Sequence, residues 1–217
     1  MQSLSEKMLR LGPPGGVFDS TVVRYLFPDA SEGARKLLVY RSIEKKEIAR
    51  LKPGIYILEK PFRKVDPHPF VLAAMLHAPS HVSLESALAY YNLIPEAVYQ
   101  VSSVTSGRSR TYHTPLGVFS FQRVPADDPR AGVKALEMHR ESWAFVAEPL
   151  RAIADLIYLT PDITWEKDGL SFLIEAMRIE EDDLRTVSLD ACDEISLSIR
   201  SCRTRTYLNG LRRTLSR

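Results

Sequence analysis

Apolar and polar positions alternate with two different periods in the first 60 residues. Residues 3–11 and 20–27 carry apolar side chains at the three- and four-residue spacing of helices. The glycine and proline residues at 12–16 and Pro28 end these helices, and Val17 begins a brief strand between them. The pattern therefore predicts two short helices near the N-terminus.

A third helix is predicted from about residue 30 to residue 45. Asp29 and Glu32 have the spacing of a capping box, in which a side-chain acceptor precedes a glutamate by three residues. Ala34, Leu37 and Leu38 fit one buried face, but Ile43 does not lie on the same stripe, so the pattern leaves the rotation of this helix open.

The residues after this helix predict a β-hairpin. Residues 47–51 and 55–58 alternate in polarity, and Lys52-Pro53-Gly54 joins them with turn-forming residues. Three helices followed by a hairpin within about 60 residues is the element order of a winged helix, a variant of the helix-turn-helix.

The rest of the chain predicts a second, mixed domain. Prolines punctuate residues 60–69, which places the boundary between domains 1–63 and 64–217. Ser83 is the expected cap of a helix over 84–91, and Ser106-Gly107 is the expected hairpin turn between strands 98–104 and 110–113. The other expected elements are a helix at 70–77, strands at 117–124, 134–140 and 143–147, and helices at 148–159, 169–179 and 182–209.

These elements predict an α+β protein. An N-terminal winged helix-turn-helix domain is followed by a mixed α/β domain with a small antiparallel sheet and C-terminal helices. The length of 217 residues allows one or two domains with proper cores.

Charge is distributed unevenly along the chain. The formal net charge is only +2, which by itself does not indicate a nucleic-acid binder. However, residues 1–64 hold 13 Lys and Arg against 7 Asp and Glu, and residues 195–217 hold 6 Arg and no acid. Residues 161–194 hold 3 basic and 11 acidic residues. Such asymmetry indicates a specific interaction surface.

The basic residues of the predicted third helix and hairpin are the candidate DNA contacts. Cations on one side of such a unit neutralise phosphates, and Arg can also bind guanine through two hydrogen bonds. The candidates on the helix and the hairpin are Arg35, Lys36, Tyr40, Arg41, Lys45, Lys46, Arg50 and Lys52. Arg108 and Arg110 join them if the second domain also faces DNA. The plainer interpretations are a solvated basic surface and a polar hairpin tip.

The C-terminal residues allow several interpretations. Six arginines there either pair with the acidic 180–194 segment of the same or another chain, bind DNA, or form a free tail; they are Arg200, Arg203, Arg205, Arg212, Arg213 and Arg217. The four acids at 180–183 fit the start of a helix better than a metal site. Cys192 and Cys202 are ten residues apart, which on one helix is too far for a disulfide, so both are expected to be free thiols.

Two segments in the middle of the chain resemble a known family. The segments SLESALAYYNLIPEAV (83–98) and SVTSGRSRTYHTPLGVFSF (103–121) are similar to the signature of the AbiEi antitoxins of abortive-infection toxin–antitoxin systems. KPGIYIL (52–58) and AEPLRAIADLIYL (147–159) extend the similarity, which spans about residues 17–160.

The resemblance implies a function for both domains. It implies an N-terminal winged helix that binds double-stranded operator repeats in the protein's own promoter. The second domain would belong to an antitoxin whose genetic partner is a nucleotidyltransferase-like toxin, without a stable complex between the two. The resemblance does not fix an oligomeric state.

The sequence favours a regulator over an enzyme. The histidines lack metal-ligand spacing, and no Walker loop, C-x-x-C or G-x-S-x-G motif occurs, so no cofactor is expected. His81 and His113 are interpreted as structural histidines. No apolar run is long enough to span a membrane, so a cytoplasmic protein without a membrane partner is expected. The alternative function is a protein-interaction module that neutralises a partner toxin by contact, through segment 180–194 or the sheet.

Overall fold

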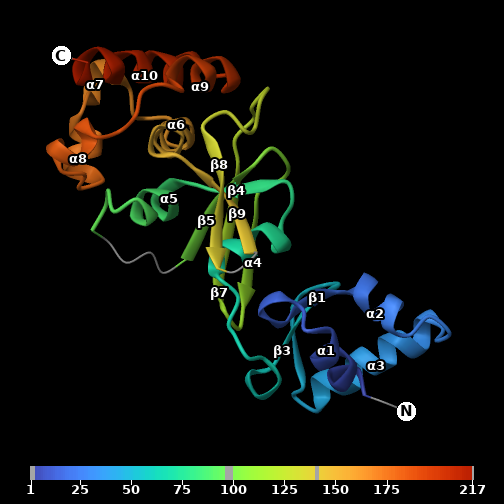
Figure 1. Cartoon of the computed structure of the whole chain (residues 1–217). Coiled ribbons are helices and arrows are strands. Elements are labelled where there is room, and N and C mark those ends of the chain that lie inside the picture. The colour runs from blue at the N-terminus through green and yellow to red at the C-terminus, as the bar shows by residue number, and fades with distance from the viewer. Residues whose placement is uncertain (1–2, 96–99, 140–141, 217) are drawn as a thin grey trace.

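The chain forms a small N-terminal lobe and a larger second lobe (Figure 1). The computed structural model describes residues 3–95, 100–139 and 142–216. Within these ranges the fold is mixed α+β, with one three-stranded and one six-stranded sheet, which confirms the predicted fold class at this level. Every helix in the described ranges is too short or too polar to cross a bilayer.

The N-terminal lobe is built from three helices and a three-stranded antiparallel sheet with the order β1-β3-β2. Its elements are α1 (Leu4–Leu11), η1 (Pro14–Gly16), β1 (Val17–Asp19), α2 (Ser20–Leu26), α3 (Glu32–Glu44), β2 (Ile48–Lys52) and β3 (Ile55–Leu58). Ser3 and Glu6 form a capping box on α1, and Asp19 caps α2. Gly54 turns the predicted hairpin with φ 83°, a value that favours glycine.

The start and the buried face of α3 differ from the sequence prediction. Ser31, not Asp29, caps the helix by accepting a hydrogen bond from the Ala34 amide at 3.2 Å. Ala34 and Leu37 are exposed, whereas Leu38 is half-buried against the N-terminal core as expected, and Val39 and Ser42 are buried. Apolar residues occur on more than one side of this helix, so contact with α1 and β2 decides which side faces inward.

The three-stranded sheet contributes to both hydrophobic cores. Nine residues form the core of the N-terminal lobe, namely Leu4, Met8, Phe18, Val23, Phe27, Val39, Ile48, Tyr56 and Leu58. Val17, Leu51 and Ile57 belong instead to the core of the second lobe. Because successive strand residues point to opposite faces, the sheet packs on its own helices with one face and on the second lobe with the other.

The second lobe contains a mixed sheet with the order β6-β7-β5-β4-β9-β8. Its strands are β4 (Ser80–Val82), β5 (Gln100–Thr105), β6 (Arg110–Thr114), β7 (Gly117–Arg123), β8 (Val133–His139) and β9 (Ser142–Ala147). η2 (Lys60–Phe62) follows β3, and its Phe62 packs against the N-terminal core. The helical elements of the second lobe are α4 (Pro69–Leu76), α5 (Leu84–Tyr90), α6 (Pro149–Leu159), α7 (Trp165–Asp168), η3 (Phe172–Ala176), α8 (Glu181–Arg185), α9 (Cys192–Ser198) and α10 (Cys202–Leu215). Figure 1 shows α5 and α6 on one side of the sheet and α4 on the other.

The strand pairing corrects the predicted small antiparallel sheet. β5 pairs with β7 in parallel, and β4 pairs with β9 in parallel. The hairpin expected at Ser106-Gly107 is therefore wrong: β6 folds back on β7 and lies outside it, so β5 and β6 are not neighbours. Alternating polarity identifies a strand but does not identify its partner. Val98 and Arg140, at the ends of two predicted strands, lie outside the described residues.

The C-terminal helices are shorter than predicted. The helix expected over 169–179 is reduced to the five residues of η3, and the long helix over 182–209 is divided into α8, α9 and α10. The acids at 181–183 occupy the first turn of α8, as predicted. Cys192 and Cys202 are both free, also as predicted.

Candidate nucleic-acid interface

A groove of about 620 Å³ lies between α2, the N-terminal half of α3 and the β2–β3 hairpin. Its lining includes four cations, Arg24, Arg35, Lys36 and Arg50, and one acid, Glu32. The groove also contains Pro53 and Gly54 at the hairpin tip. The fold therefore brings part of the predicted basic set together on one side of the N-terminal lobe.

Two of these cations, Lys36 and Arg50, have head groups exposed to solvent. Lys36 contacts Glu32 at 2.6 Å, and both side chains are about three-quarters exposed. The hydrogen bond and the charge of Glu32 raise the pKa of Lys36, so Lys36 stays charged. An exposed pair one helical turn apart exchanges readily with water or another anion. Arg50 is exposed, with its guanidinium 5.9 Å from the centre of the Tyr56 ring.

The other candidates on α3 are divided between different surfaces. Arg35 is half-buried and donates to the Phe27 carbonyl at 3.1 Å, so it ties α3 to the end of α2. Arg41 lines a second groove, on the far flank of α3. Lys45 and Lys46 are exposed at the end of the helix, about 13 Å along its axis from Lys36.

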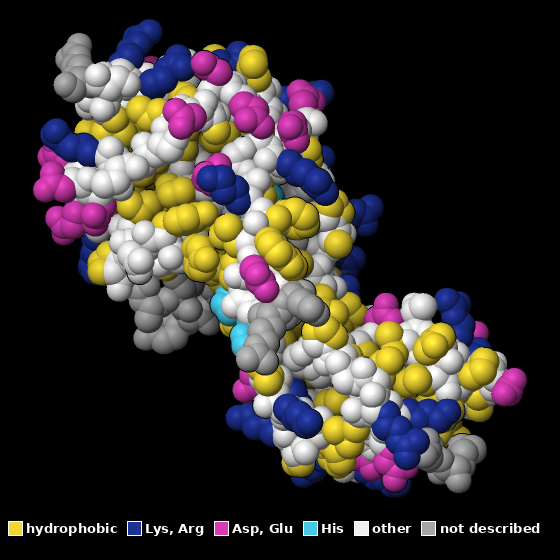
Figure 2. Space-filling view, viewed as in Figure 1, with side chains coloured by type: hydrophobic (Ala, Val, Ile, Leu, Met, Phe, Trp, Pro, Cys, Tyr) yellow, Lys and Arg dark blue, Asp and Glu magenta, His cyan; other side chains and the backbone are white. Residues whose placement is uncertain are grey.

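Tyr40 completes the candidate set on the exposed side of α3. Its side chain is 58% exposed, and it lies one turn after Lys36 on the same side of the helix. Figure 2 shows the N-terminal lobe with Lys and Arg side chains standing among hydrophobic ones, while acidic side chains are more frequent over the C-terminal helices.

Lys52 is half-buried and its ammonium contacts protein groups, so it differs from the exposed cations of the groove, and its role as a phosphate contact stays a prediction. Its Nζ donates to the Leu76 carbonyl at the end of α4 at 2.6 Å and lies 5.7 Å from the centre of the Tyr112 ring. Burial and then the charge of Arg110 lower the pKa of Lys52. The hairpin is therefore anchored to the second lobe through this lysine.

Arg108 and Arg110 are exposed on the second lobe, beside this anchor. Arg110 begins β6, the strand that lies against β2, and its charge is felt by both Lys52 and His77. Burial lowers the pKa of His77 most, and the charges of Lys52 and Arg110 lower it further. The ring of His77 packs against Phe121 with 4.9 Å between centres. The two arginines thus mark the junction of the lobes rather than the groove.

The C-terminal arginines pair within the chain. Arg212 contacts Asp193 at 2.7 Å, and Arg200 donates to Asp127 at 3.0 Å. Arg203 donates to three carbonyls in and after α6, and Arg205 donates to the Ser196 carbonyl at 3.3 Å. The pairing expected with the acidic 180–194 segment is observed for Arg212 alone among these four, whereas Arg200, Arg203 and Arg205 bind groups elsewhere in the chain. Arg213 is exposed, and Arg217 lies outside the described residues.

The second lobe also contains a buried polar cluster that the sequence pattern did not reveal. Asp155 on α6 accepts hydrogen bonds from Arg151 Nε at 2.9 Å and from Ser83 Oγ at 2.7 Å, and it lies 3.3 Å from His81 Nε2. Burial alone raises the pKa of Asp155, but Arg151, His81 and Ser83 more than offset this and hold it below the ordinary value. The four-residue spacing of Arg151 and Asp155 within an apolar helix was the available signal.

This cluster corrects one prediction and agrees with another. Ser83 occupies the cap position of α5 but donates to Asp155 instead of capping the helix. His81 is a buried histidine with a hydrogen-bond partner, as expected. Within the described ranges, His, Cys, Asp and Glu side chains do not gather into a group of three suited to hold a metal ion.

Comparison with known proteins adds nothing to this geometry. No profile of a known protein family matches the chain. A search of curated proteins likewise found no significant match.

Proposed function

We propose that this protein is a DNA-binding transcriptional repressor of the AbiEi antitoxin type, with an N-terminal winged helix-turn-helix. The order α1-β1-α2-α3-β2-β3, with the sheet order β1-β3-β2, supports this assignment because α2 and α3 would form the helix-turn-helix and β2–β3 the wing. By binding operator repeats in its own promoter, the protein would regulate the gene of a nucleotidyltransferase-like toxin. The protein and the toxin would not form a stable complex.

The groove between α3 and the hairpin is the single observation that carries this proposal. In helix-turn-helix proteins the N-terminal residues of the recognition helix contact base edges. Lys36 lies in that part of α3, and Arg50 faces the same groove from the wing. Both are exposed and close to the turn that joins the wing strands, so a duplex seated there meets cations from two elements at once.

The contact set proposed here is narrower than the one expected from the sequence. Lys36 and Arg50 line the groove and form the centre of this set together with Tyr40, which is exposed one helical turn after Lys36. Arg24 is added from α2 because it also lines the groove. Arg35 acts as a positioning residue, since its guanidinium bonds the end of α2. Lys52 is assigned to the anchor on the second lobe. Arg41, Lys45 and Lys46 would contact phosphates only where the duplex extends beyond the groove.

A mobility-shift titration with the protein's own promoter tests the proposal. The double variant Lys36→Ala/Arg50→Ala should weaken binding at least about 10-fold and reduce the salt slope by about two, since each phosphate contact contributes about one. Arg185→Ala is the matched control, because it removes an exposed arginine on α8. Equal affinity for the promoter and for random DNA at physiological salt would refute the proposal.

A protein-interaction module remains the alternative function, and one observation favours it. Trp143 and Phe145 on β9 are 56% and 40% exposed, which is unusual for large apolar side chains two residues apart on one sheet face. Co-expression with the adjacent gene product separates the two functions. Co-purification that is abolished by Trp143→Ser, together with failure of the promoter shift, would favour the interaction module.

A further inference from the structure

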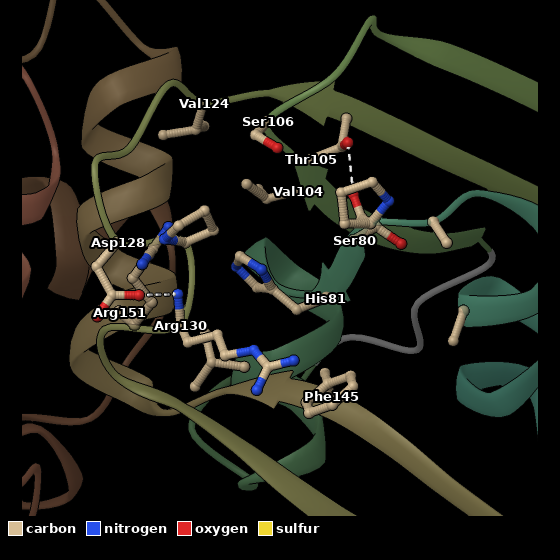
Figure 3. Close-up of a pocket in the computed structure, with 15 residues that line it drawn as sticks. Ser80, His81, Val104, Thr105, Ser106, Val124, Asp128, Arg130, Phe145 and Arg151 are labelled. Carbon is tan, nitrogen blue, oxygen red and sulfur yellow. Dashed lines mark hydrogen bonds between the residues drawn. The ribbon is translucent and has the colours of Figure 1, made fainter.

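A pocket of about 550 Å³ opens in the second lobe, between the end of α4, the start of β4, the end of β5 and the loop at 124–133 (Figure 3). This volume is within the usual range of small-molecule sites, about 300–1,000 Å³. Most of its wall is apolar, and part of that wall is formed by Ala74, Val104, Val124 and Phe145. The pocket is separate from the groove on the N-terminal lobe.

Arg130 supplies the charge at this pocket. Figure 3 shows its side chain extending across the opening towards His81 and Phe145. The guanidinium lies 5.2 Å from the centre of the Phe145 ring. Among the described residues, no Asp or Glu forms an ion pair with Arg130, whereas Arg151 at the back of the pocket is neutralised by Asp155.

The remaining polar groups limit which ligands can bind. Asp128, the other charged residue of the lining, uses its carboxylate to accept the backbone amide of Arg130 at 2.9 Å, on the opposite side from Phe145. His81 is directed to Asp155 through Nε2, which leaves Nδ1 as the ring atom for a ligand. Thr105 is engaged with the Pro79 carbonyl at 2.7 Å. One cation beside an aromatic ring is therefore the dominant recognition feature.

We propose that this pocket binds a small aromatic carboxylic acid. The carboxylate would pair with the guanidinium of Arg130, and the ring would lie on the apolar wall next to Phe145. Arginine suits a carboxylate because its planar fork donates two parallel hydrogen bonds. A pocket with an apolar wall and few polar groups at its mouth orients such a ligand with its charged end outward.

The same segment that forms the pocket wall also holds the wing, so the ligand is an effector of DNA binding. Ala78, Pro79 and Ser80 line the pocket, and Leu76, two residues earlier, accepts the hydrogen bond from Lys52. Occupancy orders this segment and strengthens the Lys52 anchor, which restricts the β2–β3 hairpin. This regulatory part rests on the proposed function, whereas ligand binding does not.

The binding experiment uses the full chain and 2-naphthoate as the probe, followed by NMR titration and calorimetry. A ligand of this size should bind with a Kd of about 1 mM or tighter. Arg130→Gln should weaken binding about 10- to 100-fold, the range for a lost hydrogen bond to a charged group. Arg213→Gln, which removes an exposed arginine on α10, should leave the affinity unchanged.

Two further probes and one further variant make the binding result decisive. The neutral 2-naphthamide should bind the wild type as weakly as 2-naphthoate binds Arg130→Gln, and 2-naphthylmethylamine should not bind. Ala74→Leu, which fills the pocket from α4, should reduce 2-naphthoate binding without touching the charge. Equal affinity of the acid and the amide, or no saturable binding up to about 10 mM, overturns the proposal.

Hydrogen exchange of the hairpin tests the coupling without DNA. With 2-naphthoate at about ten times its Kd, exchange of the amides at 48–58 should slow by up to about 10-fold, and Lys52→Met should abolish this effect. Unchanged hairpin exchange in the presence of saturating ligand overturns the coupling. A failed promoter shift would overturn the DNA-binding function and leave the ligand site standing.

Discussion

Asp155→Asn is expected to destabilise the second lobe strongly. Asp155 is fully buried and accepts hydrogen bonds from Arg151 and Ser83, with His81 at 3.3 Å. Asparagine has almost the same shape, but it is neutral and has only one acceptor oxygen. The guanidinium of Arg151, also fully buried, would lose its counter-charge.

The magnitude follows from burying an unpaired charge. Breaking a buried ion pair by removing one partner costs about 3–5 kcal/mol. For a protein of this length each kcal/mol lowers the melting temperature by about 2–4 °C, so Asp155→Asn should lower it by about 6–20 °C. Arg151 also donates from Nη1 to the Ala131 carbonyl at 2.7 Å, and this remaining bond holds the cation in place without neutralising it.

Thermal and urea unfolding followed by circular dichroism would measure the change. Asp193→Asn is the matched control, because Asp193 pairs with Arg212 at the surface and its loss should have little effect. Comparable melting temperatures for the two variants would refute the reasoning.

The pH dependence provides an independent check on Asp155. The folded pKa of Asp155 lies below its unfolded value, so the stabilisation it provides is complete above about pH 4 and is lost as pH falls through the folded pKa. The Asn variant lacks this acid-dependent loss. A wild-type unfolding curve with the same acid dependence as that of the variant would contradict the assignment of Asp155 as a buried carboxylate.

Four other substitutions have clear expected outcomes. Lys52→Met should leave the slope of log affinity against log salt unchanged, because the ammonium bonds the Leu76 carbonyl and not a phosphate; a slope reduced by about one would return Lys52 to the DNA contacts. His77→Gln should reduce the loss of stability that the wild type shows below about pH 6.5, because burial and nearby cations lower the pKa of His77 in the folded state and the unfolded state therefore takes up the proton first. Melting temperatures between pH 8 and pH 5 measure this, and identical profiles for the wild type and the variant would contradict it. Gly210→Ala should destabilise the protein by about 1–3 kcal/mol, because the added Cβ would lie 2.1 Å from the Trp165 ring. Gly33→Ala on α3 places its Cβ in open space and should stabilise the protein by up to about 1 kcal/mol. Urea midpoints that shift in the same direction for both variants would refute this contrast.

Local sequence signals predicted the N-terminal lobe well because its elements are short and strongly marked. The turn at Gly54 acts within a few residues, and the predicted helix, strand and hairpin positions agree with the structure, although Ser31 rather than Asp29 caps α3. The second lobe was predicted less well. The strands around Ser106-Gly107 were located, but their assignment as a hairpin was wrong, since β7 rather than β6 pairs with β5.

At the candidate site, too, the sequence identified some residues correctly and could not distinguish others. The sequence identified Lys36 and Arg50 as cations of the third helix and hairpin, and both line one groove. It could not separate them from Lys52, which differs only in being held by a carbonyl 24 residues away in the chain. Arg24 was missed because its element carries a single cation, and only the fold brings it into the groove.

The amino-acid sequence by itself determined the class of fold, the positions of most helices and strands, the hairpin turn at Gly54, and the asymmetry of charge. These depend on interactions between residues close together in the chain, which periodicity and capping chemistry report directly. The tertiary structure alone decided which side of α3 is buried, how the six strands are ordered, and that Ser83 and His81 meet Asp155. Those outcomes depend on contacts between distant segments, where many pairings satisfy the same local pattern and packing selects one.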